Sequence, residues 1–264
     1  GVVEFNGYQF KNIQSNNNYK NQVYVRLYWH EKTKQLFGSE LGGSIYQIYP
    51  IYKPINIVKA STLLNDTIYT INAKGEVFYA TVNNLYFKKI FSTDLNNVYS
   101  IYRNKNYFLI GSENGLYKLD ENNQKLKKLF DKKTLFIKEN PYSKDIYFST
   151  ENELYKLPYK SKNITRISST SNNLLSTHIS DIDFINESDF FVSTTKGLYH
   201  ITSDYTDCYT KTSYLPSQYL QSLYYNKNEN CLFVGTGEKG LLKLQLKNNY
   251  SFSSKQGFKE SASL

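Results

Sequence analysis

Residues 107–119 read Tyr107-Phe-Leu-Ile-Gly-Ser-Glu-Asn-Gly-Leu-Tyr-Lys-Leu, which is two short apolar runs joined by a small polar turn. The second run, a glycine followed by alternating apolar residues, recurs with starts at positions 1, 43, 75, 115, 153, 197 and 240, where a glutamate replaces the glycine at 153. The starts are about 32 to 44 residues apart, the length of one blade of a β-propeller. A unit of this size cannot bury its own apolar face, so successive units must stack. The chain is predicted to be a repeat protein.

One repeat read closely predicts four antiparallel strands. It contains Val98-Tyr-Ser-Ile-Tyr, Tyr107-Phe-Leu-Ile-Gly, Leu116-Tyr-Lys-Leu and Lys125-Leu-Lys-Lys-Leu-Phe. The connections are short and rich in Asn, Gly and Ser, as hairpin turns require. No apolar period of 3.6 residues persists, so we expect essentially no helix. The fold class predicted is therefore all-β, a propeller of four-stranded antiparallel blades.

Glycines are expected in the tight turn between the second and third strands of each blade, where a positive φ or close packing favours them. The positions concerned are Gly43, Gly75, Gly115, Gly197 and Gly240, and Glu153 takes the same place in one repeat.

The repeats predict one propeller domain over residues 1–264. Six full blades run from about 14 to 254, and residues 1–13 form the two outer strands of an incomplete blade. Residues 255–264 form a connector to further sequence. A blade divided between the two termini removes open sheet edges, so we expect a seven-bladed plan with one partial blade in this chain.

Charge and cysteine content exclude several classes of protein. The formal net charge is +9, but only Arg26, Arg103 and Arg166 are arginines, the residue best suited to phosphate and base recognition, so no nucleic-acid binding is expected. The lysines of residues 125–133 are interpreted as a solvated outer strand. Cys208 and Cys231 are predicted on an outer strand and near the start of a middle strand, either as a disulfide or as two buried or half-buried free thiols. They lack the spacing of a metal site, and we expect no metal and no cofactor. No apolar run is long enough to span a membrane.

The segments Ser193-Thr-Thr-Lys-Gly-Leu-Tyr and Gly235-Thr-Gly-Glu-Lys-Gly-Leu-Leu resemble the two-component regulator propeller repeat. The segment Gly1-Val-Val-Glu-Phe-Asn-Gly-Tyr-Gln-Phe resembles the ending of that repeat, and the resemblance covers nearly the whole chain. It departs in the second strand, where the tryptophan common in the family is Phe191 or Phe233 here.

The resemblance implies a non-catalytic sensor domain on the periplasmic or extracellular side of a bacterial inner-membrane receptor, such as a histidine kinase or hybrid regulator. It implies a response to glycan fragments. The other domains of the same receptor would be partners, and a homodimer would form through them.

Two other classes of function stay open, a protein-interaction scaffold and, less favoured, a propeller hydrolase or lyase. The three histidines, His30, His178 and His200, are interpreted as hydrogen-bonded polar residues, because no catalytic motif accompanies them. Asp181 and Asp183 share one strand face and could hold a cation, or could be a solvated or hydrogen-bonded pair.

The candidate ligand-binding residues lie on loops that are expected to gather at one face. The loops entering the first strand of each blade carry Tyr19, Asn97, His178, Gln218 and Tyr219. The turns between second and third strands carry Glu40, Glu113, Lys196 and Glu238. Such side chains could stack on and hydrogen-bond an oligosaccharide or another small ligand, or could simply be solvated.

Overall fold

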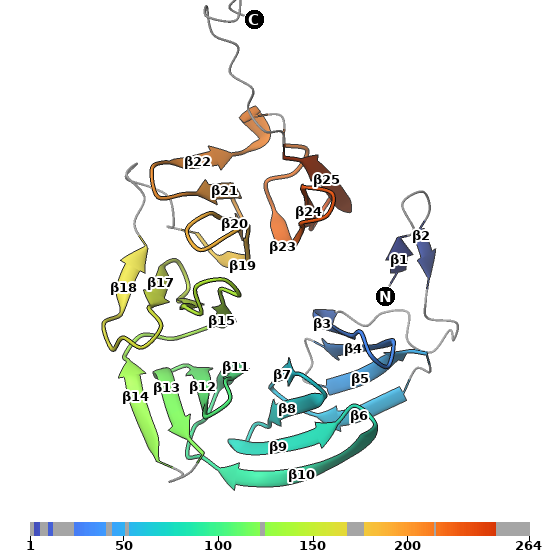
Figure 1. The fold of residues 1–264 in the computed structure, drawn as a ribbon, viewed down its shortest axis with the longest axis vertical. Coiled ribbons are helices and arrows are strands. Elements are labelled where there is room, and N and C mark those ends of the chain that lie inside the picture. The colour runs from blue at the N-terminus through green and yellow to red at the C-terminus, as the bar shows by residue number, and fades with distance from the viewer. Residues whose placement is uncertain are drawn as a thin grey trace, which may run out of the picture. The chain divides into compact units, whose positions relative to one another are not determined.

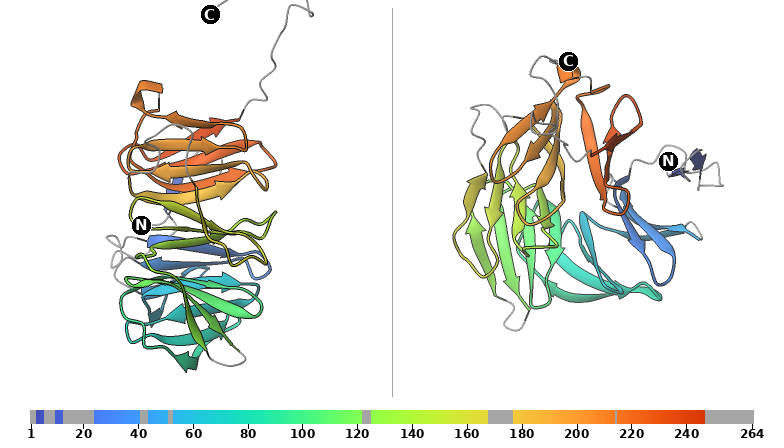
Figure 2. Two further views of the ribbon diagram at one scale, coloured as in Figure 1. Left: turned by 90° about the vertical axis from the view of Figure 1, so that its left-hand side faces the viewer. Right: turned by 45° about the horizontal axis from the view of Figure 1, so that its top comes forward.

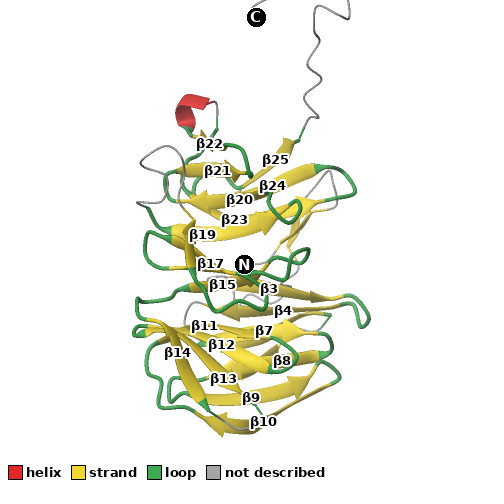
Figure 3. Ribbon diagram, turned by 60° about the vertical axis from the view of Figure 1, so that its left-hand side comes forward, coloured by secondary structure: helices red, strands yellow, loops and turns green. Residues whose placement is uncertain are grey.

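The computed structural model describes residues 3–5, 10–12, 24–40, 44–50, 53–121, 125–167, 177–213 and 215–246. Almost all regular structure in them is β-strand, and a single helical turn, Lys211–Ser213, appears red in Figure 3. The prediction of an essentially helix-free chain is confirmed for these residues. None of the helical structure described is long and apolar enough to cross a membrane.

The chain divides into two compact units, Gly1–Ser168 and Ser169–Leu264, which are described separately. The first unit holds four sheets of four antiparallel strands each, which we call blades one to four (Figure 1). Their strands are β3 (Tyr24–His30), β4 (Gln35–Glu40), β5 (Ser44–Tyr49) and β6 (Lys53–Ile57); β7 (Ala60–Leu64), β8 (Thr67–Ile71), β9 (Glu76–Thr81) and β10 (Asn84–Ser92); β11 (Val98–Arg103), β12 (Tyr107–Ser112), β13 (Gly115–Asp120) and β14 (Leu126–Phe130); and β15 (Phe136–Glu139), β16 (Ile146–Ser149), β17 (Leu154–Leu157) and β18 (Thr165–Ile167).

The second unit holds blades five and six. Blade five has four strands and blade six has three within the described residues. The strands are β19 (Ile179–Phe184), β20 (Phe190–Thr194), β21 (Gly197–Ile201) and β22 (Thr206–Tyr209), followed by β23 (Leu220–Asn226), β24 (Cys231–Thr236) and β25 (Leu241–Gln245). The predicted all-β propeller built of four-stranded antiparallel blades is therefore confirmed.

A two-stranded antiparallel sheet, β1 (Val3–Phe5) with β2 (Phe10–Asn12), precedes blade one. These two strands lie within residues 1–13, where the sequence predicted the two outer strands of an incomplete blade. The fourth strand of blade six and the connector at 255–264 lie outside the described residues. The seventh blade and the single-domain organisation stay predictions.

Alternating apolar residues explain how neighbouring blades pack face to face within the first unit (Figure 2). Ile71 and Val77 of blade two share one buried cluster with Ile101 and Phe108 of blade three. Phe91 meets Phe108 edge to face, with ring centroids 5.4 Å apart. Complete burial of such a side chain contributes about 1.5 to 3 kcal/mol, so this contact is a main source of cohesion between blades.

The predicted turn glycines lie where the second strand passes into the third. Gly75, Gly115, Gly197 and Gly240 all have positive φ, and Gly43 lies outside the described residues. At Gly115, φ is +134° and an added Cβ would lie 2.0 Å from the carbonyl oxygen of Phe130 on β14. Glycine is needed there for both conformation and space.

The buried carboxylate of Asp145, directly before β16, binds two groups from later in blade four. It accepts the backbone N–H of Tyr159 at 2.7 Å and pairs with the ammonium of Lys156 at 2.7 Å. Burial alone would raise the pKa of Asp145, but the hydrogen bonds from Lys156, Tyr159 and Ser143 outweigh it and hold that pKa below its ordinary value.

Candidate functional site

The two predicted sets of loops meet at one edge in blades three, five and six. The backbone N–H of Glu113 donates to the carbonyl of Asn97 at 3.0 Å in blade three. In blade five the N–H of Thr195, beside Lys196, donates to the carbonyl of His178 at 3.2 Å. In blade six the backbone N–H of Gly237 donates to the carbonyl of Tyr219 at 2.9 Å. We call this side of each blade the loop edge.

The described candidate residues on the loop edge are accessible to a ligand. Asn97, Glu113, His178, Lys196, Gln218, Tyr219 and Glu238 are all exposed. Tyr219 packs its ring on Gly237, where an added Cβ would lie 2.1 Å from the ring. Tyr19 lies outside the described residues, and Glu40 is described only by its backbone, which pairs with Tyr24.

A hollow of about 360 Å³ lies at the loop edge of blades three and four. We call it the polar hollow, and its lining residues are Glu113, Lys132, Lys133, Thr150, Glu151, Asn152 and Glu153. They come from the β12–β13 turn, the connector between β14 and β15, and the β16–β17 turn. Only Glu113 among them was predicted from the sequence.

Lys133 links the two blades across this hollow. Its ammonium lies 3.4 Å from Glu113 Oε2 in blade three and 3.1 Å from Glu151 Oε1 in blade four. The same ammonium lies over the ring of Tyr99, 5.2 Å from its centroid, and the Tyr99 hydroxyl donates to Glu113. The hydrogen bond to Glu151 is the main cause that raises the pKa of Lys133, and the bond from Tyr99 is the main cause that lowers the pKa of Glu113.

Glu153 is the most buried of the three carboxylates, with 16% of its side chain exposed. Lys132 lies 2.7 Å from its Oε2, the Tyr155 hydroxyl donates to the same oxygen at 2.8 Å, and Arg166 Nε lies 3.3 Å from Oε1. The bond from Lys132 is the main cause that holds the pKa of Glu153 below its ordinary value. Glu153 therefore stays ionised at neutral pH.

Two features of the sequence could have indicated the hollow. Glu153 stands in the repeat position that glycine occupies elsewhere, and its side chain enters the hollow. The lysine run was interpreted as one solvated strand, which holds for Lys127 and Lys128 on β14. It is wrong for Lys132 and Lys133, which follow that strand and form ion pairs with blade four.

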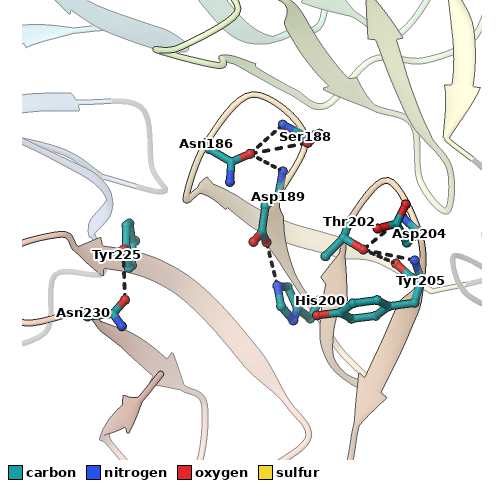
Figure 4. A network of polar contacts seen from close by, with 9 residues as sticks. All are labelled: Asn186, Ser188, Asp189, His200, Thr202, Asp204, Tyr205, Tyr225 and Asn230. Atoms are coloured by element: carbon teal, nitrogen blue, oxygen red, sulfur yellow. Dashed lines mark hydrogen bonds and ion pairs between the residues drawn. The ribbon is translucent and has the colours of Figure 1, made fainter. Parts of the chain in front are cut away.

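Two histidines are held by carboxylates, as expected of polar residues that stabilise the fold. His200 Nε2 lies 2.6 Å from Asp189 Oδ1 (Figure 4). The ring of His200 stacks on that of Phe191, with the ring centroids 4.3 Å apart. His30 lies 2.9 Å from Asp66 Oδ1 and 2.7 Å from the Thr33 hydroxyl.

Asp181 and Asp183 form the hydrogen-bonded pair that was one of the two expectations. Asp181 Oδ2 accepts the backbone N–H of Leu223 at 2.9 Å, and Asp183 Oδ2 accepts that of Tyr225 at 2.6 Å. Both bonds run from β19 of blade five to β23 of blade six. Within the part of the chain that the structure describes, no group of three or more His, Cys, Asp and Glu could hold a metal ion.

The cysteines lie where the sequence placed them, and both are free. Cys208 is exposed on the outer strand β22, and Cys231 is the buried first residue of β24. Of the two alternatives, two free thiols are confirmed. The expected burial is confirmed for Cys231 and wrong for Cys208, because the outer strand β22 exposes that side chain.

This chain is similar to known proteins in its structure but not in its sequence. No family model matches the sequence, and no curated protein matches it. A crystal structure of the extracellular domain of a protein from B. thetaiotaomicron, described as a hybrid two component system, superposes with a TM-score of 0.75 at 17% identity. The chain therefore shares the fold of the matched part of that domain. The superposition covers 94% of this chain and 36% of that one, so this chain spans about a third of the length of its solved relative.

Two further solved structures support the same conclusion about the fold. One is again the extracellular domain of that B. thetaiotaomicron protein, there described as a one component system, with a TM-score of 0.71 and 17% identity over the same shares of the two chains. The other is a nidogen/laminin complex, with a TM-score of 0.54 and 10% identity over 69% of this chain and 76% of that one. The resemblance read from the repeat motifs is thus confirmed at the level of the fold.

Proposed function

We propose that this chain is a non-catalytic sensing propeller of a two-component receptor, on the periplasmic or extracellular side of a bacterial membrane. The observation that carries the proposal is the polar hollow at a loop edge, in a fold shared with the extracellular domain of a hybrid two component system. Rigid blades hold the turns around the hollow, and repeat folds form their binding sites in this way.

The ligand we propose is an oligosaccharide or another small polar molecule. Carboxylates, ammonium groups and the Asn152 amide supply both donors and acceptors around the hollow, which suits hydroxyl groups that donate and accept. The rings of Tyr99 and Tyr155 contact the two lysines that line it. A volume of about 360 Å³ is within the range of small-molecule pockets.

The partners we propose are the other domains of the same receptor, with a homodimer formed through them. The paucity of arginine argues against nucleic acid as a partner.

A protein-interaction scaffold is the second candidate, favoured by one exposed apolar group on blade one. Leu27 and Trp29 are 53% and 48% exposed on β3, and Tyr49 is 44% exposed on β5. The rings of Trp29 and Tyr49 are 6.5 Å apart. Exposed aromatic groups of this kind are typical of protein interfaces.

The test is titration of the chain with a panel of oligosaccharides before and after single substitutions on the loop edges. Tyr19→Ala, His178→Ala and Tyr219→Ala test the predicted residues, and Glu153→Gln tests the polar hollow. Tyr86→Ala, which removes a tyrosine that is 71% exposed on the outer strand β10, is the matched control. Loss of binding in a loop-edge variant but not in the control supports the proposal. Binding to no member of the panel would refute a glycan ligand.

A further inference from the structure

The ammonium group of Lys133 occupies a cradle made of two carboxylates and one aromatic ring. The carboxylates are those of Glu113 and Glu151, at 3.4 and 3.1 Å, and the ring is that of Tyr99, at 5.2 Å. Proteins bind protonated amines through this combination, because carboxylates accept the N–H bonds and the face of an aromatic ring stabilises the cation.

Two of the three groups around Lys133 belong to the regular structure of blade three. Glu113 lies in the two-residue turn between the paired residues Ser112 and Gly115, and Tyr99 lies on β11. Lys133 extends a flexible four-carbon stem from a connector, and 30% of its side chain is exposed. Rotation of this side chain can take the ammonium away from the carboxylates without moving the backbone that carries Glu113 and Tyr99.

The carboxylates around Lys133 can accept more hydrogen bonds than this lysine donates to them. The side chain of Glu151 is 69% exposed, and its two oxygens offer about four lone-pair positions. The second lysine, Lys132, is placed similarly, between Glu153 and the Tyr155 hydroxyl, which lies 3.2 Å from its ammonium.

The charges around Lys133 favour a cationic group. The carboxylates of Glu113 and Glu151 share one ammonium there. Glu153, in contrast, is already paired with Lys132 and Arg166. An anionic ligand would draw Lys133 away from Glu113 and Glu151 and would leave these two carboxylates unpaired beside a third negative group. A cationic ligand takes the place of Lys133, so both carboxylates stay paired.

We propose that the polar hollow binds a small hydroxylated molecule that carries a protonated amine, and that Lys133 is a built-in competitor that this amine displaces. The inference rests on the proposed function, since it names the ligand class for the same site. Displacement of Lys133 also breaks the link between the loop edges of blades three and four, so it couples ligand binding to the contact between these blades.

The test is calorimetric titration of the full chain with D-glucosamine, D-glucose and N-acetyl-D-glucosamine. The work is done at about pH 6, below the ordinary pKa of an amine of this type, about 8. Lys133→Met removes the competitor, and Glu113→Gln with Glu151→Gln removes the charge of the cradle. Lys127→Met, on the exposed face of β14, makes the same change of charge outside the hollow.

We expect glucosamine to bind more tightly than either neutral sugar. Lys133→Met should tighten its binding about five- to tenfold, the equivalent of two partly exposed ion pairs. In the Lys133→Met background, Glu113→Gln with Glu151→Gln should weaken it by at least a similar factor, whereas Lys127→Met in the unmodified chain should leave it unchanged. In Lys133→Met, where no lysine competes for the carboxylates, added salt should weaken binding of glucosamine and not of N-acetylglucosamine.

Several results would overturn the proposal. Equal affinity for glucosamine and glucose would do so, as would an affinity for glucosamine that Lys133→Met does not raise. If neutral sugars bind to the unmodified chain while the amine gives no advantage, the proposed sensing function stands and the amine class is wrong. If neither kind of sugar binds to the unmodified chain or to Lys133→Met, this inference fails, and so does a saccharide ligand at the hollow. Thermal melting of each variant shows whether it folds, and the comparison of the three sugars in the unmodified chain applies without any substitution.

Discussion

Removing the carboxylates of Asp181 and Asp183 should loosen blade six from blade five. Each carboxylate accepts one backbone N–H of β23, from Leu223 at 2.9 Å and from Tyr225 at 2.6 Å. A hydrogen bond to a charged group contributes about 1.5 to 3 kcal/mol, and partial exposure of both aspartates places the expected loss near the lower end, about 1 to 2 kcal/mol for each alanine. At about 2 to 4 °C per kcal/mol for a chain of this size, Asp183→Ala should lower the melting temperature by about 2 to 8 °C.

Two measurements check this reasoning. Asparagine at either position keeps an acceptor oxygen and loses the charge, so it should cost about half as much as alanine. Hydrogen exchange should show faster exchange of the amides of Leu223 and Tyr225 in the alanine variants, while Asp204→Ala, in an exposed turn, should leave them unchanged. Unchanged protection of both amides in Asp181→Ala/Asp183→Ala would show that these hydrogen bonds do not hold the two strands together.

Three further outcomes are expected. Gly115→Ala should lower the melting temperature more than Gly240→Ala, because a Cβ at position 115 would lie 2.0 Å from a carbonyl oxygen while position 240 has open space. Equal decreases in melting temperature would show that the positive φ alone, without the steric clash, accounts for the loss of stability. Asp145 has a pKa below its unfolded value of 3.8, so its contribution to stability is present above about pH 4 and is lost as pH falls through the lower folded pKa. Melting temperatures between about pH 2 and 5 should thus fall less steeply in Asp145→Asn than in the unmodified chain, and parallel curves would contradict this. Alkylation followed by mass spectrometry should modify the exposed Cys208 in the folded chain and Cys231 only after unfolding, since Cys231 is buried and burial raises the pKa of its thiol; early labelling of Cys231 would be inconsistent with that burial.

The repeat made the blades predictable in considerable detail. The β12–β13 hairpin pairs Ser112 with Gly115, so its turn consists of the two polar residues that the sequence marks as a turn. The same reasoning placed Glu113 beside Asn97, because both flank strands whose order follows from the repeat. Alternation also placed Asp181 and Asp183 on one face, although it left open whether that face held a cation.

The candidate site was less predictable, because its members lie on different blades. Lys133 and Glu113 are 20 residues apart in the chain, with the strands β13 and β14 between them, and nothing in that spacing predicts a contact of 3.4 Å. An exposed lysine in a lysine-rich run is most simply interpreted as solvated. The replacement of glycine by Glu153 was visible in the sequence, but the partners of this carboxylate were not.

The amino-acid sequence was enough to predict the local structure of this protein: the length of the blade, the order of its strands and the positions of its turns. These follow from alternation and from turn chemistry, which act between residues near one another in the chain. The packing of the blades was needed to establish which carboxylate of one blade faces which lysine of the connector, as in Glu151 with Lys133. Contacts of that kind depend on the distance between two packed sheets, and the packing of the side chains between the sheets sets that distance.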